Sequence, residues 1–285
     1  MKRDLDSTLD AFFSGLDSAN SRRGYRQVWE AFVQWLKKRS PLRVKPIDVQ
    51  EYIISLRDAG KADSTRAWTL SALRSIYDAL TVNGFVAVNP ARSVKNPKTS
   101  HAPKAPWLEE EDVKKLLQVL EGSSWRERRN RLCVLLFLGL GWRRSEVARM
   151  RAEDFQGGTV TGIVKGRKLA TAGVPEWLRD EIRDWLAYAG FATGPLLPRG
   201  PEVHEHISGD TVYNIVCTVA EIAGLKVTPH ALRRTFITVL RERGVGLKEL
   251  QGAVAHSSSA TTERYDRKKS IAAPGEKIGD LVKRK

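Results

Sequence analysis

The sequence predicts a mainly α-helical protein of two domains, a four-helix N-terminal bundle and a larger α+β domain with a small β-hairpin or sheet. Apolar residues recur with the 3.6-residue period of helices along most of the chain. A basic, proline-rich stretch divides the chain near residue 100, and an alternating, β-branched run at 158–165 breaks the helical period. The 285 residues are enough to bury a core in each domain.

The first hundred residues contain four helical patterns. A weak pattern covers 5–15, and stronger ones cover 19–39, 46–58 and 64–82. Pro46 and Asp63 stand where helices commonly begin, as first helical residue and as N-cap. Each strong pattern places its large apolar side chains on one face, so the four helices are expected to pack as a bundle.

A linker follows the bundle. Residues 89–106 hold four prolines and four Lys or Arg side chains, with few apolar residues after Val94. We take 1–96 as the first domain, 97–106 as the basic linker and 107–285 as the second domain. The charge of the linker suits a segment that lies across a phosphate backbone, and an ordinary solvated hinge has the same composition.

The second domain returns to helical patterns and interrupts them once with a hairpin. We expect helices at 109–121 and 126–140, then a strand at 158–165 with a short partner ending near Val174. Further helical patterns cover 176–188, 209–223, 229–242 and 247–255, and a short one lies near 260–267.

Charge and composition narrow the classes of function. Lys and Arg number 48 against 33 Asp and Glu, a net charge of +15, which favours a nucleic acid partner over an acidic membrane surface. The longest apolar run, residues 132–142, is too short to span a bilayer, and the N-terminus lacks a signal-peptide pattern, so we expect no membrane association and a cytoplasmic location. Cys133 and Cys217 lie in apolar patterns and are expected to be buried filler.

No metal site is predicted. The acidic run 109–112 suits the first turn of a helix, where carboxylates complement the macrodipole. His204 and His206 could suggest a metal ligand pair, but they lie in a stretch bounded by Pro and Gly that reads as a solvated loop. The metal-dependent nucleases that would otherwise fit a basic protein need clustered carboxylates, which are missing here.

Two polar clusters in the second domain could bind a phosphate. Arg143 and Glu146 are three residues apart and can pair on one helix face, although a surface ion pair would look the same. Thr228 and Pro229 suit a helix start, which places His230 and Arg233 together near a terminus that favours anions. A capped helix with a solvated charged face is the alternative for this second cluster.

A third cluster contains His256 and Tyr265 near the C-terminus. A tyrosine there is ordinarily a packing or surface residue. The order and spacing of all three clusters together indicate a different role for Tyr265.

Together, the three clusters resemble the tyrosine recombinases, also called the phage-integrase family, which includes the Xer and Cre recombinases. Residues 141–146, GWRRSE, resemble the first box of the family, and His-Ala-Leu-Arg at 230–233 resembles the second. Tyr265 follows His256 by nine residues, as in the third box. The run VKGRK at 164–168 resembles the lysine hairpin and aligns Lys165 with the catalytic lysine, with Lys168 as the less favoured match. Three positions depart from the family pattern: Trp142 stands in place of leucine, Arg234 of histidine and Ala255 of glycine.

The resemblance implies a SAM-like core-binding bundle, a catalytic α+β domain and a site-specific recombinase or integrase that acts without metal or cofactor. Tyr265 would attack a DNA phosphate to form a 3′-phosphotyrosyl intermediate, and Lys165 would protonate the leaving oxygen. Arg143 and Arg233 would bind the phosphate oxygens, with Glu146 in support. His230 would be the base and His256 a further hydrogen-bond donor. A phenol with a pKa near 10 needs such help at neutral pH.

The partner implied by the resemblance is double-stranded DNA carrying short inverted repeats. We expect a monomer in solution that forms a homotetramer on two DNA sites. The tail resembles the family's tail that docks on a neighbouring subunit, with Ile271, Ile278 and Leu281 as its anchors. Docking within the same chain, and a disordered basic tail, are the alternatives. The candidate DNA contacts in the first domain and linker are Arg22, Arg23, Arg26, Ser64, Thr65, Arg66, Arg74, Lys95 and Lys98. A type IB topoisomerase or telomere resolvase, and a relative that binds DNA without catalysis, are the alternative functions.

Overall fold

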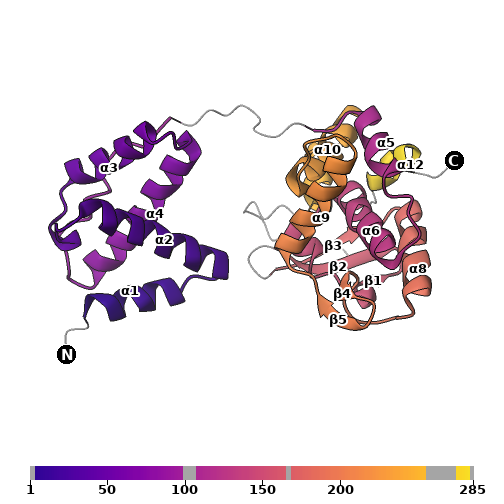
Figure 1. Cartoon of the computed structure of the whole chain (residues 1–285), viewed down its shortest axis with the longest axis horizontal. Helices are drawn as coiled ribbons and strands as arrows, with labels where there is room; N and C mark the ends of the chain where they lie inside the picture. The colour runs from indigo at the N-terminus through magenta and orange to yellow at the C-terminus, as the bar shows by residue number, and fades with distance from the viewer. Residues whose placement is uncertain (1–3, 99–106, 165–167, 255–273, 283–285) are drawn as a thin grey trace. The chain divides into compact units, whose positions relative to one another are not determined.

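The protein divides into two compact units. The computed structural model describes residues 4–98, 107–164, 168–254 and 274–282. Contacts group the chain as Met1–Ala102 and Pro103–Lys285, shown in Figure 1. Helices predominate in both units, and the strands belong to the second, which confirms the predicted fold class. No helix among the described residues is long and apolar enough to cross a membrane.

The first unit is a bundle of four α-helices and one 3-10 turn. Their bounds are α1 Leu5–Ser14, α2 Ala19–Leu36, η1 Pro41–Arg43, α3 Pro46–Asp58 and α4 Asp63–Val82. Helix α4 packs against α1, α2 and α3. Its Tyr77 is fully buried, meets Trp29 edge-on and donates its hydroxyl to Pro41 O. The amphipathic faces read from the sequence therefore meet in one aromatic core.

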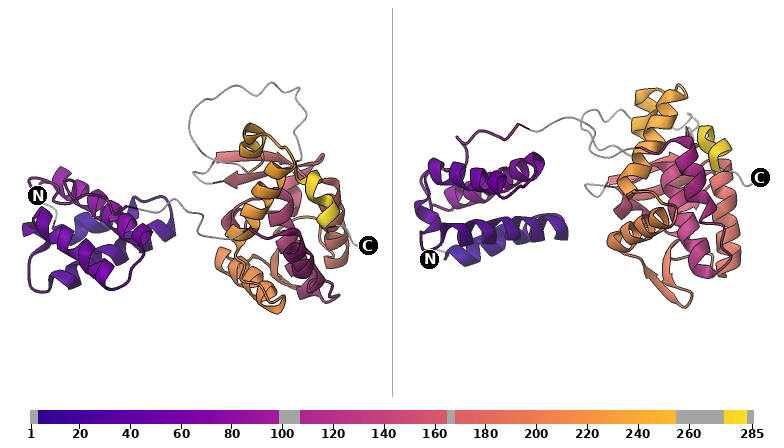
Figure 2. Two further views of the ribbon diagram at one scale, coloured as in Figure 1. Left: turned by 90° about the horizontal axis from the view of Figure 1, so that it is seen from above. Right: turned by 45° about the horizontal axis from the view of Figure 1, so that its top comes forward.

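The second unit is built around α6. Its helical elements are α5 Glu110–Gln118, α6 Trp125–Leu140, α7 Arg144–Val147, η2 Ala152–Asp154, α8 Glu176–Ala189, α9 Gly209–Ile222, α10 Pro229–Glu242, α11 Leu247–Ala253, η3 Pro274–Ile278 and α12 Gly279–Val282. Ser124 and Glu127 form a capping box that starts α6, and Gly141 ends it in the left-handed conformation. Helices α8, α9 and α10 pack around α6, as the views in Figure 2 show.

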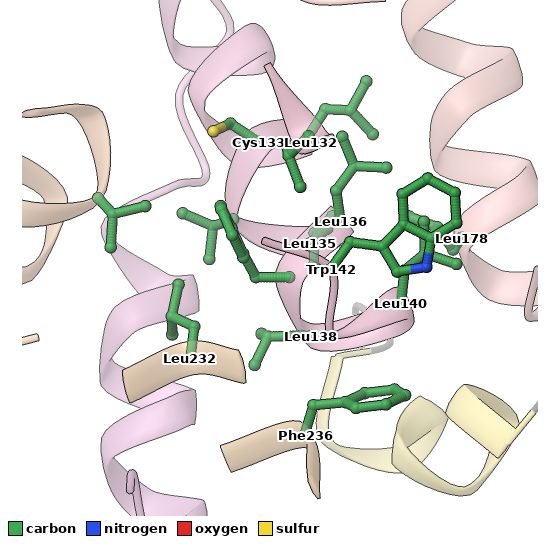
Figure 3. Close-up of a cluster of buried hydrophobic side chains, with 14 of the residues drawn as sticks. Leu132, Cys133, Leu135, Leu136, Leu138, Leu140, Trp142, Leu178, Leu232 and Phe236 are labelled. Atoms are coloured by element: carbon green, nitrogen blue, oxygen red, sulfur yellow. The ribbon is translucent and has the colours of Figure 1, made fainter. Parts of the chain in front are cut away.

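Helix α6 is buried on all sides after its first turn, which explains why its sequence has no polar face. Figure 3 shows Cys133, Leu136 and Leu138 of this helix in a cluster with Phe236 of α10. Cys133 is fully buried, and burial raises the pKa of its thiol to about 12, so it is apolar filler as predicted. Arg131 is also buried, and its guanidinium binds the Glu181 carboxylate of α8 at 2.6 Å.

The main sheet is a small antiparallel one. Strands β1 Phe155–Gln156, β2 Thr159–Val164 and β3 Lys168–Gly173 lie in the order β1–β2–β3. Strand β2 pairs with β3 from Thr159 opposite Gly173 to Val164 opposite Lys168. The hairpin expected from the change of period is therefore present, with Lys165 between its two strands.

The prediction that His204 and His206 lie in a loop is wrong. Strands β4 Pro198–Gly200 and β5 Val203–His206 form a second, two-stranded antiparallel sheet with an irregular register. Most of its side chains are exposed, so the segment has no alternation of apolar and polar residues for the sequence to reveal.

The C-terminal tail also differs from expectation. Ile278 and Leu281, which we expected to dock on a neighbouring subunit, are buried within the chain's own second unit. There η3 packs on α6 and α10, and α12 packs on α5. Arg243, the C-cap of α10, forms an ion pair with Asp280 at 2.5 Å. The third expected anchor, Ile271, lies outside the described residues.

Candidate active site

The first part of the site lies where α6 ends and α7 begins. Arg143 is the N-cap of α7, and its backbone N–H donates to Glu146 Oε2 at 2.7 Å. The Arg143 guanidinium donates to Glu146 Oε1 at 2.9 Å, so one carboxylate binds both the backbone N–H and the guanidinium of Arg143. Glu146 is buried while Arg143 is about one-third exposed, 31% by side chain. A buried anion thus orients a cation whose outer edge can reach a ligand.

Arg233 of α10 is the second part, and its surroundings differ from our reading of the sequence. We expected it on the outer face of the helix beside His230, but Arg233 is 4% exposed. Its Nη1 donates to Gly141 O at 2.6 Å and its Nη2 to Val254 O at 3.1 Å. Burial lowers the pKa of Arg233 to about 10, with Arg143 adding to the effect, so the side chain stays charged at neutral pH.

His230 starts α10 as expected and lies within the field of these cations. Thr228 caps the helix by accepting a hydrogen bond from the backbone N–H of Ala231. Partial desolvation lowers the pKa of His230, and Arg233, Arg234 and Arg143 lower it further. The imidazole is exposed. The structure therefore brings Arg143, Glu146, His230 and Arg233 together from two distant segments.

Gly141 is the contact point of these two segments. Its φ is +62°, and a Cβ built on it would lie 2.3 Å from the Phe236 ring of α10. Its carbonyl oxygen accepts the Arg233 hydrogen bond. Only glycine suits this position, both for its backbone conformation and for the lack of space.

We expect Gly141→Ala to lower the free energy of unfolding by about 2–5 kcal/mol. Roughly 1–2 kcal/mol of this comes from the left-handed backbone, and about 1–3 kcal/mol from overlap with Phe236. Gly190→Ala is a matched control, because Gly190 ends α8 in the same conformation and a Cβ built on it would have no atom within 4 Å. Equilibrium urea denaturation of the full chain measures both. Equal losses in the two variants would contradict the overlap at Phe236.

The remaining three predicted catalytic residues, Lys165, His256 and Tyr265, lie outside the described residues. Two described residues precede them closely in the sequence. Strand β2 ends at Val164, directly before Lys165, and Val254, whose carbonyl binds Arg233, lies two residues before His256.

The candidate DNA contacts of the first unit fall into two groups. In one group the guanidinium is bound by the chain itself: Arg22 donates to Leu16 O, Arg26 pairs with Asp10, and Arg66 pairs with Asp63. Arg74 donates to Ala91 O, Val94 O and the Asn96 side chain, so it holds the segment leading to the linker. The remaining candidates have exposed side chains, namely Arg23, Ser64, Thr65, Lys95 and Lys98, although the Arg23 guanidinium also donates to the Asn20 side chain. A contact of either group with DNA stays a prediction.

Among the described residues, no group of three or more His, Cys, Asp or Glu side chains is arranged to hold a metal. His206 contacts Ala148 O through Nδ1 at 3.2 Å, and His204 meets the Phe191 ring edge-on. Residues 110–112 form the first turn of α5, where Glu110 pairs with Lys114.

Comparisons with known proteins find matches to both units of the chain. The model of the phage integrase family matches residues 106–270, and that of the phage integrase N-terminal SAM-like domain matches residues 9–84. The chain is 30% identical to tyrosine recombinase XerC of Thermodesulfovibrio yellowstonii, over 87% of this chain and 86% of that protein. It is 33% identical to tyrosine recombinase XerA of Pyrococcus furiosus, over 77% and 75%.

A solved structure gives the same fold at lower identity. The lambda integrase tetramer bound to a Holliday junction has a TM-score of 0.73 and 17% identity, covering 92% of this chain and 80% of that one.

Proposed function

The chain belongs to the phage integrase family of tyrosine recombinases, and from this premise we propose that it breaks and rejoins DNA through a covalent bond between Tyr265 and a strand phosphate. One observation carries the proposal. Arg143, oriented by a buried carboxylate, and Arg233, fixed by two carbonyl groups, come from distant segments and interact electrostatically with each other and with His230. Two preorganised guanidinium groups beside an imidazole suit a phosphoryl transition state.

The reaction would proceed in one displacement. The Tyr265 oxygen attacks phosphorus, the bond from phosphorus to the 5′ oxygen breaks, and Lys165 gives that oxygen its proton. His230 takes the proton from the phenol, while Arg143, Arg233 and His256 bind the phosphate oxygens. The product is a 3′-phosphotyrosyl bond and a free 5′-hydroxyl. The energy of the broken bond is kept in the new one, so a second strand can rejoin by the reverse step.

Covalent capture tests this function without knowledge of the target sequence. Wild-type protein is incubated with a library of nicked duplexes with randomised arms, and DNA that stays bound in denaturant but is released by protease is sequenced. We expect short inverted repeats among the captured duplexes. If no duplex is captured, the chain does not act as proposed. A relative that binds DNA without catalysis would retain duplexes only in native conditions.

A topoisomerase-like activity is separated by a second assay. A recombinase relaxes a supercoiled plasmid only when the plasmid carries the captured site, whereas a type IB topoisomerase relaxes any plasmid. We expect relaxation to depend on the site.

The assembly belongs to the same proposal. The lambda integrase that shares this fold was solved as a tetramer on a Holliday junction. We propose that this chain likewise acts on double-stranded DNA as a tetramer holding two sites, that it is a monomer when free, and that it works at the nucleoid in the cytoplasm. Exposed side chains such as Arg23 and Thr65 would contribute contacts in the first unit.

The proposed role of His230 predicts a pH dependence. A general base must be neutral, and the pKa of His230 is lowered by desolvation and by three arginines. The rate of adduct formation at subsaturating DNA should therefore fall on the acid side with a midpoint below the ordinary histidine value of about 6.5. The same shift makes protonation costlier in the folded state, so the protein loses stability as the pH falls below about 6.5 and is unaffected above it.

Rate measurements between about pH 5 and pH 8 check this prediction. His230→Gln should lose the acid limb, and His204→Gln, a change of an exposed histidine on β5, should keep it. A wild-type midpoint above pH 6.5 would contradict the lowering of the His230 pKa by desolvation and by the neighbouring arginines.

A further inference from the structure

Trp142 lies between Gly141 and Arg143, two residues of the candidate site. Its side chain is 1% exposed and belongs to the cluster of Figure 3. Its indole Nε1 donates a buried hydrogen bond to Ala253 O at 3.1 Å. Ala253 is the last residue of α11, and Val254, which follows it, is held by Arg233. Two neighbouring carbonyls at the end of α11 are thus fixed by residues 142 and 233.

The other edge of the indole contacts β2. A Cβ built on Gly162 would lie 2.8 Å from Cζ3 of Trp142 and 3.2 Å from its Cη2. The ring therefore occupies the space that a side chain at position 162 would need. Gly162 pairs with Ala170 of β3, and α11 packs against β3. One rigid ring connects the hairpin with the end of α11.

In the sequence, both ends of this connection lie close to predicted catalytic residues. Gly162 precedes Lys165 by three residues along β2, and Ala253 precedes His256 by three. Resting on the proposed function, we propose that Trp142 is a positioning residue that holds the lysine hairpin and the histidine–tyrosine segment in a fixed relation. The leucine of the family pattern has no N–H to bind Ala253 O and is too small to fill the same space.

Removing the hydrogen-bond donor, together with part of the indole ring, tests the first half of the proposal. Trp142→Phe keeps an aromatic ring and leaves Ala253 O without its donor. On a nicked duplex carrying a captured site, single-turnover cleavage should slow about tenfold, the size expected from one buried hydrogen bond. The affinity for the duplex should stay within about twofold, because no contact of the protein with DNA is removed.

A matched control separates positioning from stability. Trp185 is 3% exposed, and its Nε1 donates to Leu196 O at 2.8 Å, so Trp185→Phe deletes the same group in the same unit. We expect both variants to lose similar stability in urea and Trp185→Phe to cleave at the wild-type rate. Benzothienylalanine at position 142 keeps the bicyclic shape with sulfur in place of N–H, so it separates the loss of the hydrogen bond from the loss of ring volume. It also takes the place of Trp142→Phe if that variant fails to fold.

Contact with the hairpin is tested by changing the leaving group. Trp142→Leu removes ring volume beside Gly162 and should cleave about tenfold more slowly than Trp142→Phe. A bridging 5′ sulfur leaves without a proton, so it makes the lysine dispensable. On that substrate the two variants should cleave at similar rates, and Lys165→Ala should match the wild type.

The outcomes distinguish the two proposals. Wild-type cleavage by Trp142→Phe overturns the positioning role alone. A Trp142→Leu defect that is equally large on oxygen and sulfur substrates overturns the link to the hairpin. Absence of any adduct with wild-type protein overturns the proposed function and this inference with it.

Discussion

Tyr265→Phe should bind the captured DNA site with the affinity of the wild type and form no covalent adduct. The substitution removes one oxygen atom, which in the proposed reaction is the atom that attacks phosphorus. No other residue of the proposed set can form the same bond, so adduct formation should fall below detection rather than decline by a finite factor. Electrophoresis of a nicked duplex in denaturant measures the adduct, and native electrophoresis measures binding.

Tyr188→Phe is the matched control for this experiment. The Tyr188 hydroxyl donates to Ser123 O, its ring lies under the Arg128 guanidinium, and it also contacts the Trp185 ring of α8. None of these three residues belongs to the proposed catalytic set. We expect this variant to form the adduct at the wild-type rate. Adduct formation by Tyr265→Phe would show that another nucleophile acts, and the assignment of the third sequence cluster would be wrong.

Arg233→Ala should slow adduct formation by about a thousandfold or more, because it removes a fixed cation from the transition state. The variant also leaves Gly141 O and Val254 O buried without their donor, so part of its defect could come from stability. Arg233→Lys separates the effects. Lysine keeps the charge, but its single nitrogen cannot replace the two separate nitrogens that bind Gly141 O and Val254 O or the planar fork that binds a phosphate, so we still expect a loss of at least about a hundredfold.

Arg129→Lys serves as the control for the arginine variants. Arg129 is also buried, and its Nη1 donates to Pro198 O and Arg199 O, far along the chain from the site segments. We expect this variant to lose stability in urea as Arg233→Lys does, and to retain cleavage. Near-normal cleavage by Arg233→Lys would show that the bonds to Gly141 O and Val254 O are structural only.

Most of the longer helices were predictable because their apolar faces follow the helical period, and the β2–β3 hairpin because the period changes there. The short helices α7 and α12 were not predicted. The β4–β5 hairpin was not, since its side chains are mostly exposed and leave no pattern. The burial of Ile278 and Leu281 in their own unit could not be predicted either, because an apolar residue in a tail does not indicate which surface it will cover.

The contacts of the site residues were also predictable only where the partners lie close in the sequence. Spacing along one helix predicted that Arg143 and Glu146 could pair, and they do. The burial of Arg233 depends on carbonyl groups 92 and 21 residues away, and periodicity along α10 cannot register such partners. Trp142 was visible in the sequence as a departure from the family pattern, but its bond to Ala253 spans 111 residues.

The Arg233 guanidinium has a limited number of N–H groups left for a ligand. Arginine has five N–H groups, and the carbonyls of Gly141 and Val254 take one on each terminal nitrogen of Arg233, which leaves at most three for a ligand. An incoming phosphate therefore meets a side chain whose rotamer was already selected when the polypeptide folded. The entropy cost of immobilising this side chain, up to about 2 kcal/mol, therefore lowers the stability of the folded protein and does not lower its affinity for DNA.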